Sequence, residues 1–150
     1  MSRGAGLIPA LGLVAVVIGL SACAGPSRTN DDFRHKVANT AESLDSDVQT
    51  GTLTAQLVLS HRVQMPYAAT TVSEVEDDAT AAQNTLDSRQ PPSSDADDLK
   101  DKADPVFQQA VSNIADLRVA LRRSNISDLP DLITQLQQSD HDLQPLEQVA

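Results

Sequence analysis

Apolar residues recur every three or four positions along most of the chain after residue 30, which is the spacing of helices that bury one face. Strand-type alternation of useful length is missing from the sequence. The repeating positions are Phe33, Val37, Thr40/Ala41, Leu44 and Val48; Met65, Ala68/Ala69, Val72, Val75, Ala79, Ala82 and Leu86; Leu99, Ala103, Val106, Ala110, Ile114, Leu117 and Leu121; and Leu129, Leu132/Ile133, Leu136, Leu143 and Leu146. This pattern predicts an all-α domain over residues 31–150, folded as an antiparallel helical bundle.

Helix-breaking residues suggest where the first helices begin and end. Asn30 is expected to cap the first helix and Gly51 to end it, with a second start at Thr52 or Thr54. Pro66 fits a helix interior badly, so it either kinks a helix or begins a new one. The pattern therefore leaves open whether the bundle has four helices or five.

The second half of the chain contains the clearest break. Residues 88–94, Ser-Arg-Gln-Pro-Pro-Ser-Ser, predict an exposed turn between two long helices. Pro105 lies within the next apolar stripe, so the regular helix is expected to start near Asp104. Ser127 is the expected cap of the last helix, with Pro130 in its first turn.

The N-terminus has the layout of an export signal. Arg3 precedes an uncharged apolar run of 14 residues, Leu7 to Leu20. A helix of that length reaches only about 21 Å, which is short of a hydrocarbon core of about 30 Å. Residues 1–22 are therefore expected to be a cleaved signal peptide rather than a permanent membrane span.

The four residues Leu20-Ser21-Ala22-Cys23 close this segment and resemble the lipobox of bacterial lipoproteins. The resemblance implies cleavage between Ala22 and Cys23, diacylglycerol on the Cys23 thiol, and in many members a further acyl chain on the new amino terminus. Cys23 is the only cysteine, and a lipid thioether would keep it from forming wrong disulfides after export. Residues 23–30 then form a short tether, and the protein is expected on the extracytoplasmic side of the cell membrane or outer envelope.

The charge of the chain excludes one class of partner. All 21 acidic residues lie after Cys23, together with 10 of the 11 basic ones, which leaves the mature chain with a net charge of −11. Nucleic-acid binding depends on neutralising phosphates, so it is excluded as a function. Anionic lipid headgroups would repel the same surface, so the domain is expected to stand off from the membrane that anchors it.

His61, Met65 and Tyr67 are the candidate ligand-binding residues. On a helix, His61 and Met65 would share a face, since they are four residues apart. An imidazole beside a thioether could bind copper(I), and either group could bind haem. The alternative is that Met65 belongs to the apolar stripe and His61 is a surface residue beside it. No metal site is predicted, because metal sites need three or four convergent ligands.

The acidic run Asp95, Asp97, Asp98, Asp101 and Asp104 has neither the glycine nor the glutamate of a calcium loop, and acidic residues are favoured at a helix start. The chain also has no Gly-rich phosphate loop, no His-Glu-x-x-His and no Gly-x-Ser-x-Gly, so it is not expected to be an enzyme.

The sequence thus predicts a non-catalytic envelope lipoprotein that binds another envelope protein. The alternative is a small-ligand carrier for copper, haem or a lipid.

Overall fold

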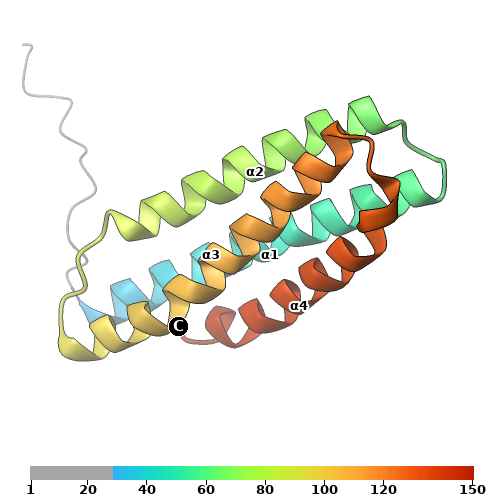
Figure 1. Cartoon of the computed structure of the whole chain (residues 1–150). Helices are drawn as coiled ribbons and strands as arrows, with labels where there is room; N and C mark the ends of the chain where they lie inside the picture. The colour runs from blue at the N-terminus through green and yellow to red at the C-terminus, as the bar shows by residue number, and fades with distance from the viewer. Residues whose placement is uncertain (1–28) are drawn as a thin grey trace, which may run out of the picture.

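The computed structural model describes residues 29–150, which form four long helices and one short 3-10 turn. The elements are α1 (Asn30–Leu59), α2 (Met65–Asp87), α3 (Ser94–Arg122), η1 (Ile126–Asp128) and α4 (Leu129–Glu147). The helices run alternately up and down in one bundle (Figure 1). There is no strand among these residues, so the predicted all-α antiparallel bundle is confirmed, with four long helices rather than five.

The four helices pack around a shared core, and one diagonal pair of helices is in closer contact than the other. Helices α1 and α3 contact each other across the middle of the bundle, and each also contacts both α2 and α4. One end of the bundle carries the start of α1, the α2–α3 turn and the chain end (Figure 1). The opposite end carries the α1–α2 loop and the loop that joins α3 to α4 (Figure 1).

The predicted apolar stripes form the core. Phe33 and Phe107 are its largest side chains and are 0% and 1% exposed. Leu53 of α1 lies outside these stripes and is 56% exposed. The burial of these apolar side chains is the main contribution to the stability of a small helical domain.

Helix α1 does not end at Gly51, so that prediction and the expected second start at Thr52 or Thr54 are wrong. The helix continues to Leu59, and Gly51 is buried in its interior. A Cβ atom at Gly51 would lie 3.5 Å from Cδ2 of Leu117 and 3.8 Å from Cδ1 of Leu136. The glycine therefore lies where α3 and α4 come close to α1, and this packing outweighs its low helix propensity.

Two predicted caps are also corrected. Thr29, rather than Asn30, caps α1, and its Oγ1 accepts a hydrogen bond from the Asp32 amide at 3.1 Å. Asp128, rather than Ser127, precedes α4, and it makes no side-chain capping bond because η1 already leads the backbone into the helix.

Pro66 and Pro105 occupy different positions in their helices. Pro66 lies in the first turn of α2, where its missing N–H costs nothing, so it begins a new helix. Pro105 lies inside α3, which starts at Ser94 after a cap by Ser93, and not near Asp104 as predicted. One backbone hydrogen bond is lost there, and the buried neighbours Ala103 and Phe107 hold the helix in place.

None of the four helices combines the length and the apolar character needed to cross a membrane. The predicted export signal, the cleavage site between Ala22 and Cys23, the lipidated Cys23 and the tether up to residue 28 lie outside the described residues.

Candidate functional site

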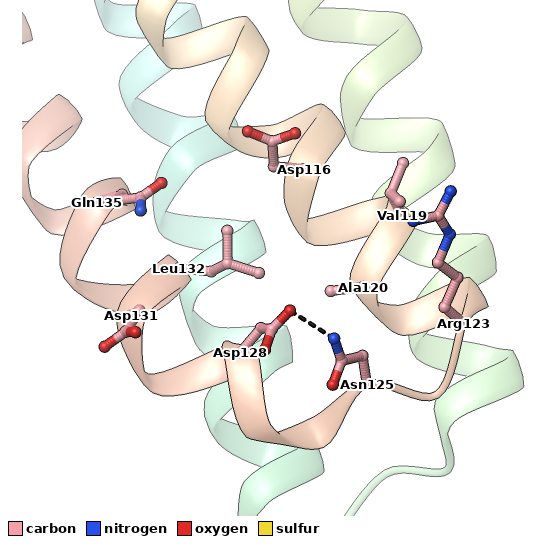
Figure 2. Close-up of a pocket in the computed structure, with 9 residues that line it drawn as sticks. All are labelled: Asp116, Val119, Ala120, Arg123, Asn125, Asp128, Asp131, Leu132 and Gln135. Atoms are coloured by element: carbon pink, nitrogen blue, oxygen red, sulfur yellow. Dashed lines mark hydrogen bonds between the residues drawn. The ribbon is translucent and has the colours of Figure 1, made fainter.

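A pocket of about 340 Å³ lies between the end of α3 and the start of α4. Its apolar floor includes Ala120 and Leu132. Asp116 lies on one side of this floor, and Asp128 and Asp131 lie on the other (Figure 2). The pocket therefore combines a small apolar surface with three carboxyl groups.

The loop between α3 and α4 shapes the rim of this pocket. Ser124 has a φ of 56°, the left-handed conformation that ends many helices. The amides of Ser124 and Asn125 donate to the carbonyls of Leu121 and Ala120, at 3.1 and 2.9 Å. The Asn125 amide side chain then donates to Asp128 (Figure 2). These bonds hold the rim in one conformation, which favours binding because little order has to be gained.

The charge and the floor of the pocket together indicate the kind of group that fits it. The residues that line the pocket include one cation, Arg123, and three aspartates, so negative charge is in excess. Long cationic side chains place their aliphatic stem on apolar surface and keep the charged head near water or carboxylates. The arrangement therefore suits a lysine or arginine side chain better than an anion or a purely apolar ligand.

A buried polar contact supports the same pair of helices below the pocket. Asn113 of α3 is 4% exposed, and its Nδ2 donates to Ser139 Oγ at 2.9 Å and to the Gln135 carbonyl at 3.2 Å. Gln109 Nε2 donates to Asn113 Oδ1 at 2.8 Å. Because buried polar groups are costly to leave unpaired, this network fixes the register of α4 against α3.

His61 and Met65 do not lie on one helix, so the helix face that their spacing would give them is not formed. His61 is exposed in the loop after α1 with a φ of 56°, and its amide donates to the Val58 carbonyl at 3.0 Å. Met65 starts α2 and packs partly buried against the core, whereas Tyr67 is 70% exposed. His61 thus has a backbone role at a helix end, and a ligand role for the three residues stays a prediction.

The acidic run after the α2–α3 turn has structural partners. Asp95 and Asp97 lie in the first turn of α3, where the helix dipole favours them. Lys100 donates to Asp104 at 2.8 Å and to Asp87 of α2 at 3.0 Å. Burial opposes its charge, but these hydrogen bonds raise the pKa of Lys100 above its usual value. Within residues 29–150, no three His, Cys, Asp or Glu side chains are placed to hold a metal ion.

The pocket residues were missed because no local motif marks them. Asp116 and Asp131 are 15 positions apart and come together only because the chain reverses between them. The available signal is that both residues lie within two helical turns of the loop at residues 123–128, since antiparallel helices bring the positions next to their connection close together. Using that signal requires knowing where the helices end. The sequence patterns predicted the helix ends less accurately than the helices themselves.

Comparison of the chain with protein-family models, with curated proteins and with solved structures gives no match. A role for this protein is therefore inferred from its own residues.

Proposed function

We propose that this protein is a lipid-anchored, non-catalytic lipoprotein of the bacterial envelope that binds a basic segment of another envelope protein. The observation that carries the proposal is the acidic pocket between α3 and α4, at the end of the bundle opposite residue 30. The lipobox resemblance at Cys23 supports the anchor, and the pocket supports the binding role.

The position of the pocket suits a protein tethered at its N-terminus. Helix α1 has 30 residues, so it spans about 45 Å between the tether and the far end. The segment that precedes the helix, Ala24 to Thr29, adds at most roughly 20 Å. Anchored in this way, the bundle would hold its membrane end close to the lipid and its pocket toward a partner.

The chemistry of the partner follows from the charge. A body with a net charge of −11 attracts basic segments and speeds their approach. At the pocket, aliphatic stems of a basic segment would contact Leu132 and Ala120, while its ammonium or guanidinium heads approach Asp116 on one wall and Asp131 on the other.

Cys23→Ala tests the anchor. We expect the variant protein to leave the membrane fraction or to accumulate as an unprocessed precursor, because neither lipid transfer nor lipobox cleavage can occur without the thiol. Fractionation of cells followed by intact-mass measurement of the protein checks this, with Ser27→Ala in the tether as a matched control. A mature, membrane-bound Cys23→Ala protein would show that the anchor assignment is wrong.

Asp116→Asn combined with Asp131→Asn tests the pocket. Both residues are exposed, and they lie on opposite walls, so the double variant removes two charges with little effect on folding. We expect binding of a short lysine- and arginine-rich peptide to weaken about tenfold, since two partly exposed charge contacts of roughly 0.7 kcal/mol each are lost. Titration of isotope-labelled protein followed by NMR measures the affinity and locates the amides that shift.

The control for this experiment is Glu74→Gln combined with Asp77→Asn, which makes the same charge change on the exposed face of α2. The peptide should bind this control nearly as well as it binds the wild type, with shifts concentrated in residues 116–135. Equal weakening in both double variants, or shifts spread over every acidic face, would show that the peptide binds by net charge alone and would refute the pocket.

A further inference from the structure

Helices α1 and α4 bring three carboxyl groups together at their interface. Asp45 of α1 interacts with Asp140 and Glu147 of α4. The Gln49 amide nitrogen donates to Asp45 Oδ2 at 2.6 Å and to Asp140 Oδ1 at 3.1 Å, so one amide bridges the two aspartates. Asp45 Oδ1 and Glu147 Oε1 are screened from solvent and have no hydrogen-bond partner. Such an arrangement is costly when every carboxyl group is ionised.

The α1–α2 interface repeats this feature two residues further along α1. Asp47 Oδ2 is also screened from solvent without a hydrogen-bond partner. The charged group that acts on it from α2 is Asp78, another carboxylate. Both interfaces of the middle of α1 therefore carry like charges that face each other.

These surroundings favour the protonated forms of Asp45 and Asp47. Burial and the neighbouring carboxyl groups of Asp140 and Glu147 raise the pKa of Asp45 to about 7, against the opposing effect of the Gln49 hydrogen bond. Burial and the charge of Asp78 raise the pKa of Asp47 to about 6. The ordinary value for an aspartate in both cases is 3.8.

We propose that Asp45 keeps a proton that it donates to Asp140 across the α1–α4 interface, and that this proton makes the packing of the C-terminal half of α4 against α1 sensitive to pH. In mildly acidic surroundings, a proton taken up from water lets one carboxyl donate to the other and closes the interface. Its release toward neutral pH leaves adjacent carboxylates and loosens α4. The inference concerns the α1–α4 interface and does not depend on a role for the α3–α4 pocket.

The direction of the pH dependence follows from proton linkage. The folded state keeps a proton that the unfolded chain releases near the ordinary aspartate value. The stabilisation is fully present below that value and is lost as the pH rises through about 7. The protein should therefore lose stability between mildly acidic and neutral pH, the range over which many proteins gain it.

Hydrogen exchange of the intact domain tests the proposal. Backbone amides of α4 from Ser139 to Glu147 should lose roughly tenfold protection between about pH 5.5 and about pH 7.5, after correction for the intrinsic exchange rate, since one proton is released over this range. Asp45→Asn imitates the protonated acid, so this variant should keep its protection at both pH values.

Asp142→Asn is the matched control, because it removes one exposed carboxylate of α4 two residues from Asp140. It should retain the full pH dependence. If Asp45→Asn and the wild type lose the same protection, or if Asp142→Asn abolishes the loss as well, general charge repulsion is the cause and the proposal is overturned. Carbon-13 titration of the wild-type carboxyl groups gives an independent answer: a midpoint near 4 for Asp45 would also overturn it.

Discussion

Replacing Phe107 with alanine is expected to lower the free energy of unfolding by about 3–5 kcal/mol. The side chain is 1% exposed and is one of the two largest residues in the core. The substitution removes its transfer free energy and leaves a cavity that the helices of a closed bundle can fill only in part. Urea unfolding followed by circular dichroism measures the change, and the folded variant should remain helical.

Tyr67→Ala is the control for this experiment. Tyr67 is an aromatic residue of similar size, but it is 70% exposed at the start of α2. Its replacement should change the free energy of unfolding by no more than about 0.5 kcal/mol. Comparable losses in both variants would mean that Phe107 does not occupy the interior as described.

Phe107 also shows how far the apolar pattern specifies the core. The pattern placed Ala103, Val106 and Ala110 on the buried face of α3, and Ala103 and Ala110 are buried. Val106 is only half-buried, and its neighbour Phe107 fills the interior instead. Both positions fit a stripe spaced by three and four, and which of them points inward depends on how α3 is rotated against its neighbours. That rotation is set by tertiary packing.

Helix ends were predicted less well than helix faces, and the reason lies in the conformation of the capping residues. A glycine after a helix is the usual end signal, and it led to Gly51 as the expected end of the first helix. The structure instead ends α1 and α3 with His61 and Ser124, both at a φ of 56°. Neither residue type is a strong sequence signal for the left-handed conformation, so the two loops could not be placed from local rules.

The candidate sites depend on these helix ends and on contacts between distant residues. Asp45 and Asp140 are 95 positions apart, and only the pairing of α1 with α4 brings them together. The acidic pocket likewise requires the reversal at residues 123–128. The sequence revealed the excess of acidic residues, but which carboxyl groups meet is determined by the register between helices.

Substitutions at Gly51 are expected to change stability in opposite directions. Gly51→Ala should raise the free energy of unfolding by about 1 kcal/mol, because alanine loses less conformational entropy in a helix interior. Its methyl group would lie 3.5 Å from Cδ2 of Leu117 and 3.8 Å from Cδ1 of Leu136, which are ordinary contact distances. The added atom therefore fits without displacing either leucine.

Gly51→Leu should instead lower the free energy of unfolding by about 2–3 kcal/mol or prevent folding, despite the good helix propensity of leucine. Three further carbon atoms would have to enter space already held by Leu117 and Leu136, which are both fully buried. Urea unfolding of the two variants beside the wild type separates the effects. A loss of stability in Gly51→Ala would mean that the helices are packed more tightly than the distances indicate. A gain in Gly51→Leu would mean that α1 can move away from α3 and α4, and the buried glycine would then be no constraint on the bundle.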